Sequence, residues 1–430
     1  MKLLDTYLHR VTSSIKSKEA RTLVTKELTQ HIKQAQQAWL RKGLTEEDAL
    51  QKSIAEMGSP STVGESMNKI YKPKVDWMLI GLLVSVMVLS FLPVMAQTMY
   101  GSEFLVKRKV MFVVLGIVLA ITMMFLDYRK LQKYGYVFFC IGSAILLLIS
   151  VFPTAIINGQ PVFMVKPLKI ESMMAMPFYV IAWATFFHNR TNLFVCMGLF
   201  LISSCLFIMN FQVTTVFVYM ALVATLFLYS SFSRKIKFIV MGTVVSLGIG
   251  LALWFVIFLQ TEVIKPYQIE RITAFFHPED HANGMGYLYI GLRNVISEAH
   301  WIGGNTSDSV ILSEAHTNFV LASVIQSYGL LLAIVLVTIF ALFAVRVLTI
   351  VFKIRDPYAR LLLVGGLTVL GAQSIYHIGM TFGYLPIVTM PMPLVSYGLM
   401  PTMLGAFLVG LALSVWRRKN LYVTTERTIS

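Results

Sequence analysis

Charged residues are scarce in this sequence. Asp, Glu, Lys and Arg make up 13% of its 430 residues, whereas hydrophobic residues make up 57%. A soluble globular domain of ordinary composition carries about 25% charged residues. The composition therefore excludes a soluble globular protein and predicts a protein with several membrane-spanning segments.

Cysteine and closely spaced metal ligands are also scarce. The three cysteines, Cys140, Cys196 and Cys205, lie inside apolar runs, which indicates small buried side chains and excludes a disulfide framework. The polar segment before residue 320 contains four histidines, namely His277, His281, His300 and His316. They lack the close spacing of zinc ligands. We therefore predict no metal centre, although the sequence leaves a bound divalent cation open.

Acidic residues are few relative to basic ones. The 21 Asp and Glu residues against 36 Lys and Arg residues give a formal net charge of +15. This excess suits a protein that contacts anionic lipid on its cytoplasmic side. The basic residues are scattered among loops without an interleaved aromatic patch, so we predict the membrane as a partner and no nucleic acid.

The first 76 residues differ in composition from the rest of the chain. EARTLVTKELTQHIKQAQQAWL, residues 19–40, has apolar residues at helical spacing. Thr45 and Asp48 form a capping-box pattern, and Gly58 with Pro60 is a helix stop. We predict a cytoplasmic module of about three helices over 1–76. It resembles the prefix domain ahead of some bacterial permeases and sensors, and both an orienting and a partner-binding role stay open.

Apolar runs long enough to cross a bilayer recur from Trp77 onward. Because the first begins only there, we expect no N-terminal signal peptide. We predict an all-α membrane domain of ten spans over 77–419 and a cytoplasmic tail over 420–430. The spans are Trp77–Ala96, Val110–Leu126, Tyr134–Phe152, Met173–Phe187, Leu193–Met209, Val213–Tyr229, Phe238–Leu259, Val320–Leu348, Leu361–Met380 and Pro401–Trp416. The eighth contains Gly329, so we expect its first part to be a separate short helix or a tilted extension.

Basic residues in the short loops predict the orientation. The loops after the second, fourth, sixth and eighth spans and the segment after the tenth carry Lys and Arg, as in 129–133, 234–237 and 417–419. With ten spans these all fall on one side, so both termini are predicted to be cytoplasmic. The opposite, outer side carries a long acidic loop at 260–319, and loops of this length are usually functional.

Two segments carry a resemblance to a known family. GYLPIVTMPMPLVSYG, residues 383–398, resembles G-L-L-P-x-T-G-I-P-L-P-F-x-S-Y-G-G-S, which joins spans nine and ten of the SEDS proteins FtsW, RodA and SpoVE. The long loop contains YQIERITAFFHPEDHANGMGY and ends in ILSEAHTNF, similar to Y-x-x-x-R-I-x-x-F-x-x-P and L-P-E-A-H-T-D-F of that family. With the span count, these matches cover nearly all of 77–419.

The resemblance implies a function. SEDS proteins polymerise glycan strands from lipid II, the undecaprenyl-pyrophosphate-linked precursor, at the outer face of the bacterial plasma membrane. They work with a class B penicillin-binding protein in peptidoglycan synthesis, serving cell shape, division or sporulation. A lipid-linked precursor flippase is an older proposal for the family, but these spans carry almost no charged residues for a transport pathway.

The position of the family's catalytic Asp in H-T-D-F corresponds to Asn318, whose amide cannot accept a proton near neutral pH. Three interpretations remain. Glu314 could supply the carboxylate from one helical turn earlier, since residues four apart share a helix face. Alternatively, the chain is a catalytically inactive scaffold or regulator that binds lipid II. A third interpretation, compatible with both, is a helix start capped by Thr317 or Asn318.

Basic side chains near the outer face are the candidates for binding the pyrophosphate of lipid II. They are Arg271, Arg293, Lys166 and Lys169, with His316 as a hydrogen-bonding partner. Ion pairs of the arginines with Glu270 or Glu298, and membrane anchoring by the lysines, are the alternatives.

Three prolines, Pro386, Pro391 and Pro393, interrupt helices near the membrane, where irregular backbone is tolerated only against protein or water. With the motif residues Ser396, Tyr397 and Gly398, they predict either a cavity wall between spans nine and ten or a short outer turn.

Overall fold

The computed structural model describes residues 2–96, 102–157, 160–165, 168–210, 212–258, 273–284, 286–304 and 314–421. Its internal contacts divide the chain into two compact units. One comprises Met1–Asp76 together with Val415–Ser430, and the other comprises Trp77–Ser414. Our division into 1–76, 77–419 and 420–430 rests on composition and stays a prediction.

The N-terminal unit contains four helices, one more than the sequence predicts. They are α1 (Lys2–Ser13), α2 (Lys18–Leu40), α3 (Glu46–Glu56) and α4 (Pro60–Tyr71). The predicted cap is present, because the hydroxyl of Thr45 accepts a hydrogen bond from the backbone N–H of Asp48 at 3.3 Å. Pro60 begins α4 after α3 has ended, as the helix-stop signal indicates.

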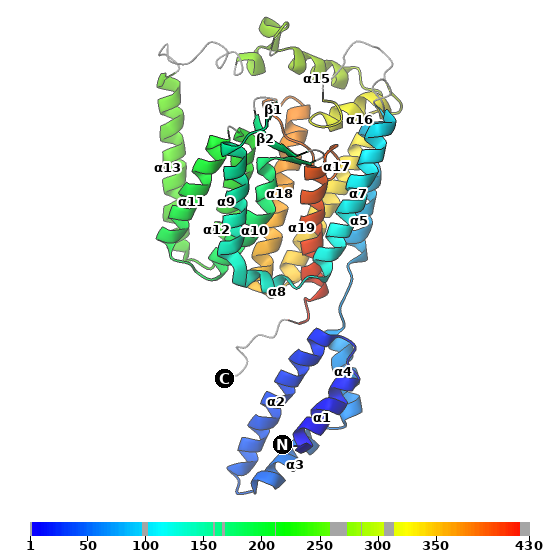
Figure 1. Ribbon diagram of the computed structural model, residues 1–430, viewed down its shortest axis with the longest axis vertical. Helices are drawn as coiled ribbons and strands as arrows, with labels where there is room; N and C mark the ends of the chain where they lie inside the picture. The colour runs from blue at the N-terminus through cyan, green and yellow to red at the C-terminus, as the bar shows by residue number, and fades with distance from the viewer. Residues whose placement is uncertain are drawn as a thin grey trace. The chain divides into compact units, whose positions relative to one another are not determined.

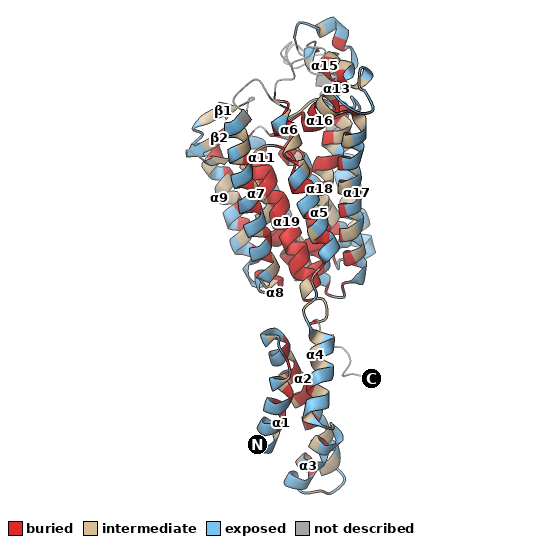
Figure 2. Cartoon of the chain, turned by 90° about the vertical axis from the view of Figure 1, so that its right-hand side faces the viewer, coloured by how far each residue is buried: buried red, intermediate tan, exposed pale blue. Residues whose placement is uncertain are grey.

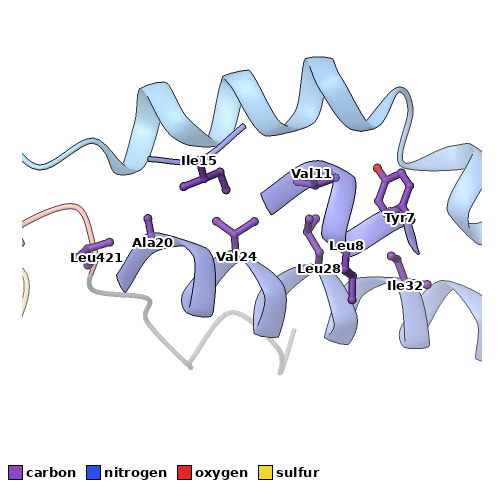
Figure 3. Packing of buried hydrophobic residues seen from close by; sticks show 9 residues of the cluster. All are labelled: Tyr7, Leu8, Val11, Ile15, Ala20, Val24, Leu28, Ile32 and Leu421. Atoms are coloured by element: carbon purple, nitrogen blue, oxygen red, sulfur yellow. The ribbon is translucent and has the colours of Figure 1, made fainter. Parts of the chain in front are cut away.

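The core of the N-terminal unit is a row of apolar side chains from α1 and α2 (Figure 3). Val11, Val24 and Ile32 have no exposed surface. Leu421, from the chain after the last membrane helix, completes this cluster. The nearby guanidinium of Arg418 forms an ion pair with Glu19, with Nη2 and Oε1 3.0 Å apart. The two ends of the chain therefore form one small domain.

The second unit is a bundle of apolar helices (Figure 1). Its helices include α5 (Trp77–Leu89), α6 (Leu92–Met95), α7 (Ser102–Phe125), α8 (Tyr128–Leu131), α9 (Gly135–Val151), α10 (Met176–His188), α11 (Leu193–Met209), α12 (Val213–Tyr229), α13 (Arg234–Phe258), α16 (Val320–Tyr328), α17 (Leu330–Lys353), α18 (Pro357–Thr381) and α19 (Leu399–Arg417). Each of the ten predicted spans coincides with one of these helices or with consecutive ones.

Five helical segments of the described chain are long and apolar enough to cross a membrane. They are Trp77–Met95, Tyr128–Val151, Leu330–Lys353, Pro357–Thr381 and Leu399–Arg417, and shorter apolar helices lie at Leu193–Met209 and Thr214–Tyr229. The polypeptide is therefore a multi-helix membrane protein. Cys140 and Cys205 are exposed, so our expectation that all three cysteines are buried is wrong for these two. The lipid-facing surface of a membrane helix is itself apolar, which is why an apolar run does not imply burial.

Helix α19 is the most enclosed of the five long apolar helices (Figure 2). Small residues let it approach α7 closely, as is common in membrane bundles. A Cβ atom on Gly410 would lie 2.7 Å from the carbonyl oxygen of Ala120, and one on Gly116 would lie 3.1 Å from the side chain of Thr402. Helices α7 and α19 thus pack backbone against backbone.

A break in the helix at Gly329 separates α16 from α17. Gly329 has φ +93°, a conformation that favours glycine, and a Cβ atom there would lie 2.9 Å from the carbonyl oxygen of Trp301. The N–H of Leu330 donates to the carbonyl of His300 at 2.9 Å. The expected separation of the long eighth apolar run into a short helix and a span is confirmed.

The sequence interpretation missed a small antiparallel sheet between α9 and α10. Strands β1 (Ala155–Ile157), β2 (Gln160–Val165) and β3 (Leu168–Ile170) pair in the order β1-β2-β3. The 3₁₀ helix η2 (Ser172–Ala175) follows them. In the described part of the long loop, the 3₁₀ helix η3 (Pro278–His281) and the helix α15 (Tyr287–Ser297) are formed.

Candidate functional site

Glu314 begins a tight turn that we call the acidic turn, residues 314–319. Its φ is +61°, a left-handed conformation that costs a non-glycine residue about 1–2 kcal/mol. Its carbonyl oxygen compensates by accepting backbone hydrogen bonds from Thr317 and Asn318, both at 3.0 Å, and from Phe319 at 3.3 Å. Such strained residues persist where the surrounding contacts hold them, and they cluster at functional sites.

The acidic turn places the side chains of Glu314 and Asn318 against each other. The amide Nδ2 of Asn318 donates a hydrogen bond to the carboxylate Oε2 of Glu314. Asn318 is buried. The predicted proximity is therefore present, but a turn rather than a helix produces it.

The helix-cap interpretation of Thr317 and Asn318 is wrong. Helix α16 starts at Val320, and Phe319 occupies the N-cap position without a side-chain cap hydrogen bond. The physical reason is position: both residues precede the N-cap inside the turn, where the hydroxyl of Thr317 donates to the carbonyl of Glu314 at 3.2 Å and the amide of Asn318 donates to its carboxylate.

The segment 386–398, which we call the Pro-rich segment, is packed directly on the acidic turn. The N–H of Tyr397 donates to the carbonyl of His316 at 2.8 Å. The hydroxyl of Ser396 donates to the carbonyl of Thr317 at 2.6 Å and accepts from the N–H of Met392 at 2.8 Å. The rings of His316 and Tyr397 meet edge to face, with centroids 5.3 Å apart. The structure thus brings together two motifs that lie about 80 residues apart in the sequence.

His377, on α18, hydrogen-bonds to the Pro-rich segment and to the first turn of α16, and it was not among our candidates. Its ring is fully buried. Nδ1 lies 2.8 Å from the carbonyl oxygen of Met390, which can only accept, so Nδ1 carries the proton. Nε2 then accepts from the N–H of Leu321, in the first turn of α16, at 3.4 Å. The only sequence signal for this role is that His377 lies a few residues before the motif that starts at Gly383.

The environment of the acidic turn makes His316 neutral. Burial lowers the pKa of His316, and the charge of Glu314 opposes that shift only in part. Its Nδ1 is buried and, within the described residues, has no hydrogen-bond partner. Burial raises the pKa of the Tyr397 hydroxyl, while the nearby charge of Arg108, on α7, opposes this shift. The imidazole of His316 therefore lies near the charge of Glu314, the ring of Tyr397 packs against that imidazole, and the charge of Arg108 lies near the Tyr397 hydroxyl.

The two predicted cations that lie among the described residues each pair with a carboxylate outside the acidic turn. Lys169 pairs with Glu171, with Nζ and Oε1 3.0 Å apart. Arg293 pairs with Glu279, which our alternative did not include, and Glu270 lies outside the described residues. Both pairs are partly exposed to solvent. Lys166 and Arg271 lie outside the described residues.

The prolines of the Pro-rich segment have different environments. Pro386 is exposed, Pro391 is partly buried and Pro393 is buried. Gly398 has φ +148°, which favours glycine, and leads into the first turn of α19. The expected cavity wall stays a prediction, whereas an irregular turn between α18 and α19 is present.

A model of a family of cell cycle proteins, FtsW/RodA/SpoVE, matches residues 73–421. The chain belongs to this family. A relative in Geobacter metallireducens, "Probable peptidoglycan glycosyltransferase FtsW", is 28% identical over 356 residues, covering 77% of this chain and 90% of the relative. Matches to some other curated relatives are shorter and span between 39% and 44% of those proteins' length.

Two solved structures share the fold. One belongs to a peptidoglycan synthase complex described for its coordination of polymerization and crosslinking; its TM-score is 0.66 at 22% identity, covering 80% of this chain and 98% of that chain. The other is the rod shape determining protein RodA of Thermus thermophilus, with a TM-score of 0.58 at 19% identity, covering 80% of this chain and 97% of that one. The predicted fold class and family are confirmed.

Proposed function

We propose that this chain is a peptidoglycan glycosyltransferase that polymerises glycan from lipid II. The observation that carries the proposal is the carboxylate of Glu314, which the acidic turn brings against the side chain of Asn318. The family resemblance puts the catalytic carboxylate at position 318. The turn brings the carboxylate of Glu314 into hydrogen-bond contact with the side chain at that position, which supports the proposal.

Glycosyl transfer from lipid II needs a base for the hydroxyl of the acceptor sugar. In the proposed step, the carboxylate of Glu314 takes the hydroxyl proton as the sugar oxygen forms a bond to the anomeric carbon of the donor. The bond from that carbon to the pyrophosphate oxygen breaks, and undecaprenyl pyrophosphate leaves with the electron pair. A positioned base contributes about 10²–10⁴-fold to such a rate.

The pyrophosphate leaving group needs positive charge nearby. Lys169 and Arg293 would have to exchange their present carboxylate partners for the phosphates. Arg108 is a cation that the sequence interpretation did not include. It is half-buried, its guanidinium lies 4.9 Å from the ring centroid of Phe104, and its charge reaches Tyr397. We therefore add Arg108 to Arg271 as a candidate contact for the phosphates.

A catalytically inactive scaffold that binds lipid II is the second candidate function. The specific observation in its favour is that Asn318 is neutral and already engages Glu314, so the carboxylate has a hydrogen-bond partner before any substrate arrives. Under this alternative, the acidic turn serves to recognise the sugar without removing a proton.

Polymerisation of purified lipid II by the full chain tests the proposal. We expect wild type to make glycan polymer, and Asn318→Asp to make it as well. No product from wild type together with product from Asn318→Asp would overturn the assignment of Glu314 as the base and favour the scaffold. No product from either variant, with lipid II binding retained, would overturn the glycosyltransferase proposal itself.

We further propose that the acidic turn faces the outside of the bacterial plasma membrane, that both termini are cytoplasmic, and that a class B penicillin-binding protein is the partner. The similarity to a chain of a peptidoglycan synthase complex supports the partner. A tag inserted after Asp280 should be accessible in intact cells, whereas a C-terminal tag should need permeabilisation. A cytosolic position of the Asp280 tag would contradict this orientation.

A further inference from the structure

Two lysines near one end of α7 have opposite environments. Lys107 is exposed, with 78% of its side-chain surface accessible, and pairs with Glu103. Lys109, two residues later, has no exposed surface. Burying a lysine is costly unless its ammonium group is fully hydrogen-bonded, so Lys109 needs a specific reason to be inside.

The acceptors of Lys109 are three consecutive carbonyl oxygens of the Pro-rich segment. Its Nζ lies 3.1 Å from the oxygens of Val395 and Ser396 and 3.5 Å from that of Leu394. An ammonium group has three N–H donors and no acceptor, which matches three carbonyl oxygens. Without a cation, these three oxygens would converge on one buried point and repel one another.

The backbone held by Lys109 is strained. Leu394 has φ +64°, so it is, like Glu314, a left-handed non-glycine residue. Its N–H donates to the carbonyl of Pro401 at 3.0 Å. Its side chain lies over Gly405, where a Cβ atom would come within 2.5 Å of the Leu394 Cγ. Several contacts are therefore needed to keep this backbone conformation. One of them is the hydrogen bond from the ammonium of Lys109 to the carbonyl oxygen of Leu394.

A short chain of contacts leads from Lys109 to the acidic turn. Ser396, whose carbonyl accepts from Lys109, donates its hydroxyl to the carbonyl of Thr317. Tyr397 donates its N–H to His316. The conformation of the acidic turn, with Glu314 at its start, thus depends on the part of the Pro-rich segment that Lys109 holds.

We propose that Lys109 is a positioning residue of the candidate site. It crosslinks α7 to the carbonyls of Leu394, Val395 and Ser396 and so sets the place of the acidic turn. Its effect on catalysis rests on the proposed glycosyltransferase function, whereas its effect on the two segments does not. Lys109 touches no substrate in this role.

The experiment compares Lys109→Met with Lys107→Met, a matched control at the exposed lysine of the same helix. Backbone hydrogen exchange of the full chain in detergent reports the segments whether or not the protein polymerises glycan. We expect Lys109→Met to raise exchange about tenfold or more in peptides covering 392–398 and 316–319. Lys107→Met should leave both peptides unchanged. Unchanged exchange in Lys109→Met would overturn the proposal.

If the wild-type protein is active, polymerisation kinetics provide a second test of the proposal. A misplaced base predicts a fall in kcat of about 10- to 100-fold in Lys109→Met, with KM for lipid II changed much less. Lys109→Arg retains a cation and donors for the carbonyls, so it should recover part of both losses. If Lys109→Met does not fold, Lys109→Arg and Lys109→Gln decide. The proposal is upheld if Lys109→Arg keeps the exchange and kcat of wild type while Lys109→Gln, which keeps N–H donors but is shorter and uncharged, loses protection. Equal hydrogen exchange and equal kcat in the wild-type protein and all the Lys109 variants would overturn the proposal.

Discussion

Asn318 donates its side-chain amide to the carboxylate of Glu314, four residues earlier, across a turn that Glu314 itself begins with a left-handed backbone. The hydrogen bond orients the carboxylate and cannot neutralise it, because an amide has no proton to transfer near neutral pH. The proposed base and the side chain that orients it thus lie within five residues of the sequence.

Asn318→Asp places a second carboxylate in contact with Glu314. Two such groups cannot both be charged at this distance, so the pair retains one proton to a higher pH than a single carboxylate would. We expect the acidic limb of the pH–rate profile for glycan polymerisation to move to higher pH in this variant. Asn318→Ser, which adds no charge, is the control. Identical acidic limbs in wild type and Asn318→Asp would show that the two side chains do not interact during catalysis.

Protonation of His316 should destabilise the folded protein. Burial lowers the pKa of His316 in the folded state, whereas the unfolded residue titrates near about pH 6.5. The unfolded state therefore binds more protons below that pH, and this contribution to stability is present above it and lost as the pH falls. Thermal unfolding of His316→Asn should depend less on pH than wild type. His9→Asn, at an exposed histidine, should retain the wild-type dependence, and the same dependence in His316→Asn would contradict the burial argument.

Gly405 on α19 makes room for the strained Leu394. A Cβ atom at Gly405 would lie 2.5 Å from the Leu394 Cγ, so we expect Gly405→Ala to lower the free energy of unfolding by about 1–3 kcal/mol. Gly371→Ala on α18 is the matched control, because a Cβ atom there meets nothing within 4 Å. Thermal unfolding in detergent measures both. Leu394→Ala in the Gly405→Ala background should recover part of the loss, and equal stability of the two glycine variants would refute the overlap.

The ion pair of Glu19 and Arg418 should hold the C-terminal segment to the N-terminal helices. Arg418 is 3% exposed and pairs with Glu19 through Nε and Nη2, each at 3.0 Å from a carboxylate oxygen. Glu19→Gln removes the negative charge that pairs with the buried guanidinium of Arg418, which should lower the free energy of unfolding by about 1–3 kcal/mol. We expect faster limited proteolysis within 1–76, and Glu65→Gln, at an exposed position of α4, should not change it. Equal cleavage rates would mean that the pair contributes nothing measurable.

Local signals in the sequence predicted much of the fold. The apolar runs predicted the membrane helices, Thr45 predicted a helix cap, and Gly329 predicted the break before α17. These features depend on neighbouring residues alone. The strands at 155–170 were not predicted because they are short. The fourth N-terminal helix was not predicted because only four residues separate α1 from α2.

The candidate site was predicted only in part. The closeness of Glu314 and Asn318 is a local property of five consecutive residues, so their spacing indicated it. Lys109 meets Ser396 across 287 positions, and His377 meets Leu321 across 56. A single sequence carries no record of such long-range contacts. Lys109 also follows Lys107 and Arg108, and three basic residues so close together are typical of an exposed basic cluster.

The most direct measurement of the central claim is the rate of glycan polymerisation from lipid II by Glu314→Gln. Glutamine keeps the shape of the side chain and an oxygen for the amide of Asn318, but it cannot take a proton. We predict a fall of about 10²–10⁴-fold relative to wild type, with Glu298→Gln as an active control. A Glu314→Gln variant that polymerises as fast as wild type would contradict the account.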